Sequence, residues 1–578
     1  MNQKTLRTNP IRTALAFLMA LLMILSALMG TAANVYAKES NDGSLSVAVL
    51  SDLHMLAPSL VGNTSDFKNV TTSNRKMFKE SAAIIDARLQ KIRDEKPDVL
   101  LLAGDLTKDG ELESHKELAK MLQKFHQQSP KTKIYVTNGN HDINNRFAMN
   151  YNTDGKAKAA TRTSPQDFEN TYSITYKDKS IIARYLPTNG KSGGLSYVAR
   201  PKPGYTFIVI DSCKYTSDNT STGKDEHQTG GHLSTDLENW VLRQIASAKN
   251  RGDTVIGMEH HNIVPHFSFE PTIRDEFIIE DYDRLSTNFA DAGMHFIFTG
   301  HMHSQDVAKK ITRNGNDFYD IETGACVNYP SPMRYVTFQR SHDRRGRLKE
   351  TLKGTTFDGG GFTYTDPTIC AQATIDNIKS YGEKQIISRK LVRQLARHDL
   401  SVNMKAGGKT YTSAEYSDKV NSIMNALMDI KVTADGSKNL YDYCKYAYLH
   451  YLAGEDGEKK PDWFKEADKK LSSGSLLQTC VTTIVGQLKG YDDTKSQNII
   501  KYLFLPPKYL SRKGIDSDKF TTLIMQMRNG GTLSSSDLKE LNTFYKGLMN
   551  SISYDSNFAN DKNFTINELE LDGQTVKE

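Results

Sequence analysis

Five short apolar runs in this chain each end directly in Asp, His or Asn. The clearest is residues 134–142, Ile-Tyr-Val-Thr-Asn-Gly-Asn-His-Asp, in which a β-branched run breaks at Gly139. This pattern is typical of a buried strand that ends in a loop. The five runs continue into Asp52-Leu53-His54, Gly104-Asp105, Gly139-Asn140-His141-Asp142, His260-His261 and Gly300-His301-Met302-His303. The sequence therefore predicts five strands that deliver these side chains to one edge.

Taken singly, these motifs are weak indicators of a metal site. Gly-Asn-His-Asp is often only a turn, because Asn and Gly are ordinary turn residues. The ordered set is more specific than any of its members, since every motif directly follows an apolar run. In this series and order the chain resembles the calcineurin-like metallophosphoesterase superfamily, and the resemblance covers about residues 45 to 340.

The resemblance implies a pair of divalent metal ions. Carboxylate, imidazole and amide groups together suit such ions, and one carboxylate can bridge both. Carried over residue by residue, the ligands of one ion are expected to be Asp52, His54, Asp105 and His303, and those of the other Asp105, Asn140, His260 and His301. In the superfamily a hydroxide that bridges the two ions attacks the phosphorus of an ester. Mn, Fe and Zn all fit these ligand types, so the metal is left open.

His141 is implied to act in catalysis without binding a metal. In the superfamily the histidine at this point approaches the substrate phosphate or the leaving oxygen, which suits general acid or electrostatic work. We expect Asp142 to orient its imidazole through Nδ1. His261 either lines the site or is structural. For three further histidines the structural reading is favoured: His115, His232 and His266.

The first 37 residues have the pattern of a secretory signal peptide. Three basic residues precede an apolar stretch at 14–29, and Val35-Tyr36-Ala37 follows as a small-residue cleavage site. An uncleaved membrane anchor is the alternative, because the apolar core is long for a signal peptide. We therefore expect a secreted protein, or one retained at the cell surface, without a stable membrane span after cleavage.

Two domains are expected after the signal peptide. From Leu45 onward strand-like and helix-like segments alternate, which predicts an α/β domain over residues 38–366. The resemblance to the metallophosphoesterases implies that this domain is a β-sandwich flanked by helices. Apolar residues then recur at helical spacing and predict an all-α domain over residues 367–578. The Tyr-rich stretch 441–451 is either core or a stacking platform for a base or sugar. More loosely, the arrangement is similar to bacterial class III cyclic-nucleotide phosphodiesterase-like proteins that carry a helical C-terminal domain.

Charge and cysteine content do not indicate an additional binding partner. Residues 1–37 hold three basic and no acidic residues, so the rest of the chain has 71 basic against 68 acidic residues. This balance gives no electrostatic reason to expect a nucleic acid polymer. The five cysteines are widely scattered, and we expect mostly buried thiols with at most one disulfide. The expected partner is a small phosphate ester, and the oligomeric state is left open.

The predicted function is hydrolysis of phosphodiesters such as cyclic nucleotides. Sites for dianionic monoesters commonly add an arginine fork, and the loops after Asp105 and His141 offer none before Arg146. An arginine from a distant loop, such as Arg75 or Arg334, would weaken this argument. The alternatives are a phosphomonoesterase or nucleotidase on the same metals, and a secreted binding protein without turnover.

Overall fold

The computed structural model describes ten ranges of the chain. These are residues 43–187, 191–267, 270–273, 275–342, 348–386, 414–455, 459–473, 475–503, 517–539 and 561–570. The predicted signal peptide lies outside the described residues and stays a prediction. No helix in these ranges combines the length and apolarity that crossing a bilayer requires.

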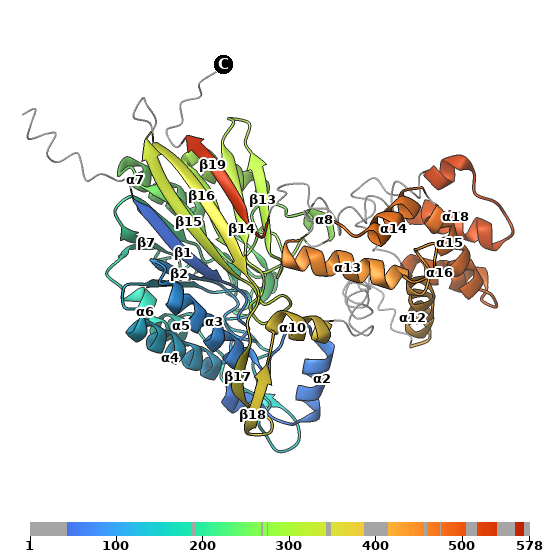
Figure 1. Ribbon diagram of the computed structural model, residues 1–578, viewed down its shortest axis with the longest axis horizontal. Helices are drawn as coiled ribbons and strands as arrows, with labels where there is room; N and C mark the ends of the chain where they lie inside the picture. Colours follow the sequence, from blue (N-terminus) through green and yellow to red (C-terminus); the bar gives the residue numbers. More distant parts are fainter. Residues whose placement is uncertain are drawn as a thin grey trace, which may run out of the picture.

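Two mixed sheets pack face to face (Figure 1). The first has the strand order β19 (Phe564–Glu570), β16 (Leu348–Phe357), β15 (Met333–His342), β1 (Ser44–Leu50), β2 (Val99–Ala103) and β3 (Lys133–Thr137). The second has the order β13 (Asp306–Ile311), β14 (Asp317–Glu322), β12 (Met294–Thr299), β11 (Thr254–Met258), β8 (Tyr205–Val209), β7 (Tyr197–Lys202) and β6 (Ile181–Arg184). Side chains of both sheets share one core, in which the rings of Phe296 and Phe338 lie 5.5 Å apart. The predicted α/β sandwich is confirmed.

All five predicted strands are present, and they are divided between the two sheets. β1, β2 and β3 run parallel in the first sheet, and β11 and β12 run parallel in the second. Nearly every residue of these strands is buried, which explains the continuous apolar runs in the sequence. The expected single edge is therefore formed by two sheet ends that meet.

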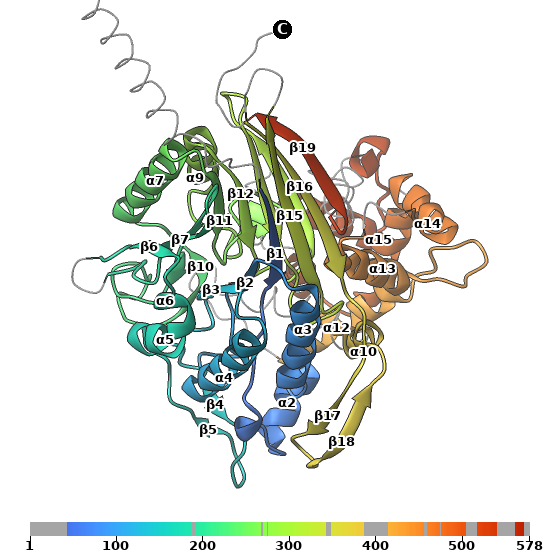
Figure 2. The same cartoon turned by 60° about the vertical axis from the view of Figure 1, so that its left-hand side comes forward.

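Helices cover the sandwich on both sides (Figure 2). α3 (Ser81–Glu95) and α4 (Leu112–Gln128) bury apolar stripes in the core that contains β1 to β3. α7 (Thr235–Asn250) and α9 (Tyr282–Ala292) pack on the outward side chains of the second sheet. The helical spacing read in the sequence is thus a packing signal. Shorter elements are η1 (Pro58–Leu60), α2 (Ser65–Ser73), β4 (Met149–Asn150), β5 (Lys158–Ala159), α5 (Pro165–Thr171), α6 (Ser173–Tyr176), β9 (Cys213–Lys214), β10 (Gln228–Gly231), α8 (Glu270–Ile273), β17 (Phe362–Asp366), β18 (Ala371–Ile375) and α10 (Ile378–Ile386).

The C-terminal region is helical and has a hydrophobic core of its own. Its helices are α12 (Ala414–Met428), α13 (Leu440–Ala453), α14 (Asp462–Ser472), α15 (Ser475–Gln487), α16 (Asp493–Leu503) and α18 (Ser517–Arg528). Tyr443 stacks on Phe464 with ring centroids 4.4 Å apart, so part of the Tyr-rich stretch is core. The chain then returns to the sandwich, because β19 pairs antiparallel with β16. The sequence did not lead us to expect this strand, and the domain boundary at residue 366 stays a prediction.

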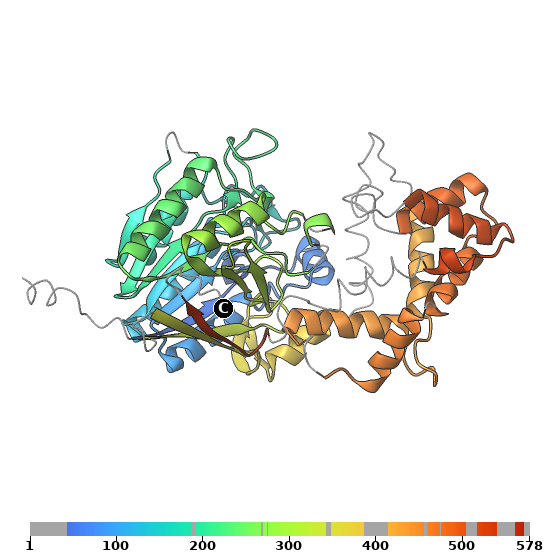
Figure 3. The ribbon, with the colours of Figure 1, turned by 90° about the horizontal axis from the view of Figure 1, so that it is seen from above.

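α13 connects the helical region to the sandwich (Figure 3). Its C-terminal turn packs Leu449, Leu452 and Ala453 against Tyr329. The backbone N–H of Gln305 donates to Leu452 O at 3.2 Å, and the Ser304 hydroxyl donates to the Tyr451 hydroxyl at 3.2 Å. α13 therefore contacts the loop after β12, which carries the predicted ligands His301 and His303. The five cysteines are free thiols, so the structure contains no disulfide among them.

Candidate metal centre

Five of the predicted ligands lie on backbone in the left-handed region. The φ angles are 49° at Asp52, 35° at His54, 48° at Asp105, 76° at His301 and 69° at His303. Residues other than glycine rarely adopt this region, and such strain persists only where the surroundings enforce it. Hydrogen bonds between the loops do so here: His54 N donates to Asp105 O at 2.9 Å, and His301 N donates to Asp52 Oδ2 at 3.0 Å.

Two motif glycines allow these loops to approach one another. A Cβ on Gly139 would lie 2.1 Å from the backbone N of Asp105, and one on Gly300 would lie 1.9 Å from Ser51 Oγ. Neither approach is possible for a residue with a side chain, because backbone and buried atoms would have to move. The glycines in these motifs therefore serve close packing of the ligand loops.

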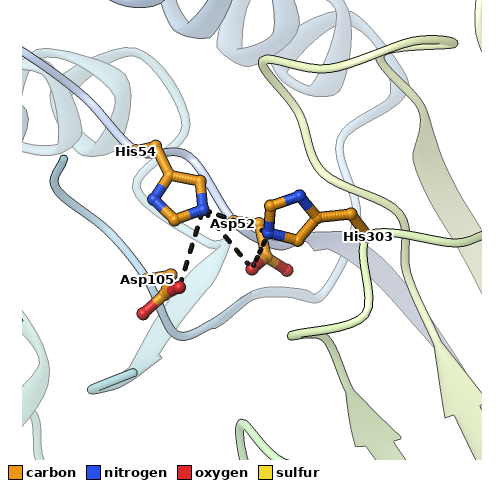
Figure 4. A group of neighbouring side chains, drawn as sticks. All are labelled: Asp52, His54, Asp105 and His303. Atoms are coloured by element: carbon orange, nitrogen blue, oxygen red, sulfur yellow. Dashed lines mark hydrogen bonds and ion pairs between the residues drawn. The ribbon is translucent and has the colours of Figure 1, made fainter. Parts of the chain in front are cut away.

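The first cluster comprises Asp52, His54, Asp105 and His303 (Figure 4). His303 Nε2 lies 3.1 Å from Asp52 Oδ1 and 3.2 Å from His54 Nε2. His54 Nε2 in turn lies 3.5 Å from Asp105 Oδ2. All four side chains are buried. Two imidazole nitrogens and two carboxylates thus converge on one point.

The second cluster contains Asp105, His260 and His301. His260 Nε2 lies 3.4 Å from Asp105 Oδ1, 3.1 Å from His301 Nδ1 and 3.2 Å from Asn140 Oδ1. Asp105 turns one oxygen to each cluster, which is the arrangement a bridging carboxylate requires. The structure therefore brings together all seven residues that the sequence indicated as ligands.

Backbone carbonyls fix the tautomers of two of these histidines. His260 Nδ1 lies 2.9 Å from Ala103 O, and His301 Nε2 lies 3.2 Å from Glu276 O. A carbonyl can only accept, so each of these nitrogens carries the hydrogen and leaves the other nitrogen with a free lone pair. That other nitrogen is the one that faces the cluster in both residues.

The residues fit a pair of divalent cations. Asp52 Oδ1 is buried and lies 3.1 Å from Nε2 of His303, another of the predicted ligands. Burial alone would raise the pKa of Asp105, but His260 and His141 hold it well below its usual range. The site thus keeps ionised carboxylates beside lone pairs of nitrogen, a donor set that suits Mn, Fe or Zn.

His141 lies beside both clusters and differs from the ligands. Its Nε2 is 3.9 Å from Asp105 Oδ2, and 28% of its side chain is exposed. Its Nδ1 is 2.8 Å from Asp109 Oδ1. Burial would lower the pKa of His141, but Asp105 and Asp109 raise it above the usual value. The structure therefore leaves one nitrogen of His141 accessible and anchors the other.

The prediction that Asp142 orients His141 is wrong, because Asp109 occupies that place. Asp142 accepts hydrogen bonds from the backbone N–H groups of Leu106, Thr107 and Gly139 at 2.8 to 3.0 Å. It is fully buried, and burial together with Asp105 raises its pKa to about 6. Asp142 thus holds the Asp105 loop to the Asn140 loop and does not face substrate.

The four other histidines considered in the sequence analysis have hydrogen-bond or ion-pair partners within the fold. His261 Nδ1 lies 2.9 Å from Ser212 Oγ and its Nε2 lies 2.9 Å from Thr229 O, so both nitrogens are used although its ring packs against His301. The others have partners as follows: His115 with Tyr172, His232 with Glu280, and His266 with Asp306. The structural reading therefore describes all four.

Three residues at the centre were not assigned roles from the sequence. Asp109 stands in the Gly-Asp-Leu-Thr-Lys-Asp-Gly stretch, four residues after Asp105, where a turn can aim it back at His141. Arg75 and Lys76 lie between α2 and α3. Arg75 was considered from the sequence only as an arginine that could reach in from a distant loop, and no sequence signal pointed to Lys76. Arg334, the other arginine considered, is buried and donates to the carbonyl oxygens of Glu322 and Asp561.

Comparison with known proteins agrees with the geometry of the site. Residues 45–305 match the family model of the calcineurin-like phosphoesterases. No curated protein has detectable similarity to the chain. A dimetal phosphatase from Danio rerio aligns at 12% identity with a TM-score of 0.35, over 57% of this chain and 98% of its own. A second solved structure aligns at 10% identity with a TM-score of 0.26, over 53% and 98%. TM-scores this low carry no argument, so the assignment rests on the family match and the ligand clusters. Residues 45–305, which hold all seven predicted ligands, thus match the calcineurin-like phosphoesterases in sequence and contain the two ligand clusters.

Proposed function

We propose that this protein is a secreted, binuclear phosphodiesterase whose substrates are small phosphodiesters such as cyclic nucleotides. The observation that carries the proposal is the shared carboxylate: Asp105 turns one oxygen to each ligand cluster, with His141 beside it. A protein that only binds a ligand has no chemical need for both clusters and a positioned imidazole. The proposed location outside the cell rests on the signal-peptide pattern of residues 1–37.

The protein's own groups have separate tasks in this reaction. When bound, two divalent cations supply a water of lowered pKa and positive charge for the phosphoryl oxygens. The seven ligands hold that positive charge at the ends of the strands. His141 stands in reach of the scissile ester, and its Nε2 donates a proton to the leaving oxygen. Asp109 accepts from Nδ1 of His141 at 2.8 Å, which keeps the ring oriented and favours its protonated form.

The choice between diester and monoester depends on nearby positive charge. Support for a diester comes from the loops after Asp105 and His141, which place no arginine at the clusters. Arg75 and Lys76 favour the second candidate, a phosphomonoesterase, because they bring two cations to His303 and His54. A monoester dianion gains more from such cations than a diester monoanion does.

Matched substrates test the proposal. We expect the protein to hold about two metal equivalents, and to hydrolyse an aryl phosphodiester with a higher kcat/KM than the aryl monoester at one pH and metal loading. A tenfold preference for the monoester, about 1.4 kcal/mol in transition-state binding, would replace the diesterase by the second candidate. Metal-loaded protein that turns over neither ester would support the alternative of a binding protein without turnover.

Cleavage after Ala37 is checked by N-terminal sequencing of the exported protein.

A further inference from the structure

Two of the four ligand histidines face cations on their outer side. His303 Nδ1 lies 3.4 Å from Arg75 Nη2, and His54 Nδ1 lies 3.5 Å from Lys76 Nζ. Figure 4 shows that each ring turns its other nitrogen, Nε2, toward Asp52. His260 and His301 differ, because the outer nitrogen of each donates a hydrogen bond to a backbone carbonyl oxygen.

These two contacts are incompatible with a loaded metal site. A neutral imidazole whose Nε2 binds a metal carries its hydrogen on Nδ1, so Nδ1 becomes a donor. Guanidinium and ammonium groups are also donors only. Metal binding therefore turns each contact into a donor facing a donor, and Arg75 and Lys76 need an acceptor in its place.

The carboxylates of the described residues do not provide this acceptor. Within the described ranges, no carboxylate forms a salt bridge with Arg75 or Lys76, and the nearby Asp109 is already paired with Lys108. Asp52 and Asp105 would face two divalent ions as well as these two cations. The site thus keeps a formal excess of positive charge that a monoanion cannot balance.

Arg75 is held in this place by the helical region. Its Nη1 donates to the hydroxyl of Tyr448 on α13, which leaves Nη2 directed at His303. Arg75 and Lys76 are each intermediate in exposure. α13 therefore positions Arg75 beside the ligand His303.

We propose that Arg75 and Lys76 form a subsite for a second anionic group of the substrate, separate from the phosphate that reacts. The inference rests on the proposed phosphoesterase function and deepens it. An acceptor at the outer nitrogen of a ligand imidazole lies about 5 Å or more from the metal, given usual metal–nitrogen and hydrogen-bond lengths. The reacting phosphoryl group binds the metals directly, so it does not fill this place. The substrate class is a phosphodiester that carries a further phosphate or carboxylate.

A pair of nucleotides tests the subsite. Thymidine 3′,5′-bisphosphate and thymidine 5′-monophosphate differ by one phosphate, and calorimetry on metal-loaded protein measures their Kd values without turnover. We expect the bisphosphate to bind at least about tenfold more tightly, the usual scale of one charge-assisted hydrogen bond. Arg75→Gln and Lys76→Gln should each reduce that ratio toward one, and Tyr448→Phe should reduce it in part. The matched control is Lys68→Gln, because Lys68 is an exposed lysine on the neighbouring α2.

The 5′-(4-nitrophenyl) esters of the same two nucleotides give a second readout. Wild-type protein should prefer the ester with a 3′-phosphate, and the Arg75 and Lys76 variants should lose that preference while metal analysis still finds about two equivalents. An unchanged bisphosphate-to-monophosphate ratio in both variants would overturn the subsite even if the wild type is an active diesterase. Absence of any ester hydrolysis by the metal-loaded wild type would overturn the function instead.

Discussion

Replacing Asp105 by Asn should remove both metals at once. In the wild type the backbone N–H of His141 donates to Asp105 Oδ1 at 2.8 Å. Asparagine has the same size and can still accept this hydrogen bond, but it carries no charge. The two carboxylate oxygens face different clusters: Oδ1 lies 3.4 Å from His260 Nε2, and Oδ2 lies 3.5 Å from His54 Nε2. One unit charge opposite another at about 4 Å is worth ~4 kcal/mol at an effective dielectric constant near 20. Each metal should therefore bind at least about a thousandfold more weakly.

Metal content and calorimetry measure this effect. Purified Asp105→Asn protein, dialysed against micromolar metal, should contain far less than one equivalent. Asp109→Asn is the matched control, because Asp109 is a carboxylate of the same region that contacts His141 and Lys108 and lies outside both clusters. It should retain about two equivalents. Loss of one equivalent with full retention of the other in Asp105→Asn would refute the bridging role.

Three other changes probe the site and the sandwich. His141→Ala should keep its metals while kcat falls by about 10² to 10⁴, the usual contribution of a positioned acid; loss of metal would make His141 a ligand. Gly300→Ala should lower both metal content and Tm, because its Cβ would meet Ser51 Oγ at 1.9 Å; an alanine variant with normal metal content would show that the loop adapts. Glu350→Gln tests a buried carboxyl on β16, remote from the metals, to which Thr254 Oγ1 donates at 2.9 Å. Burial raises the pKa of Glu350 from 4.5 to about 8, so between these pH values the folded state holds a proton that the unfolded state has lost. The wild type therefore loses stability as pH rises through this window, and the denaturant midpoint of Glu350→Gln should exceed that of the wild type more at pH 8 than at pH 5. Equal differences at both pH values would contradict the shift.

Sequence reasoning found the strands and ligands because both are local patterns. A buried parallel strand needs a continuous apolar run, and the loop after it begins at a fixed point, so Asp52 and His301 can be placed at strand ends from the sequence. Their roles as ligands came from the resemblance to the superfamily. Asp109 could not be separated from Asp142 in this way. Both stand a few residues beyond a strand end, and which of them meets His141 depends on how the turns at Gly110 and Gly139 orient the chain.

Contacts between segments far apart in the chain could not be predicted from the sequence for a related reason. Arg75 comes from a long polar loop, and its direction is set by Tyr448, which lies in another part of the fold. This pairing weakened the sequence argument that no arginine approaches the metals. β19 was missed because Phe564 and Ile566 are buried only through their pairing with β16, and seven residues after a helical region give a weak alternating signal.

The return of β19 to the first sheet makes the helical region an insertion. β16 precedes it and β19 follows it, and both strands belong to the same sheet, so the region is tethered at two points. Two tethers keep α13 at a high effective concentration beside the loop of His303, even if the docking contacts open for a moment. A cut after residue 366 would take away the strand that covers β16 and also Asp561, whose carboxylate accepts from Val307 N at 3.0 Å. Removing the helices cleanly would instead require a linker that joins the two strands, as in the excision of one domain nested within another.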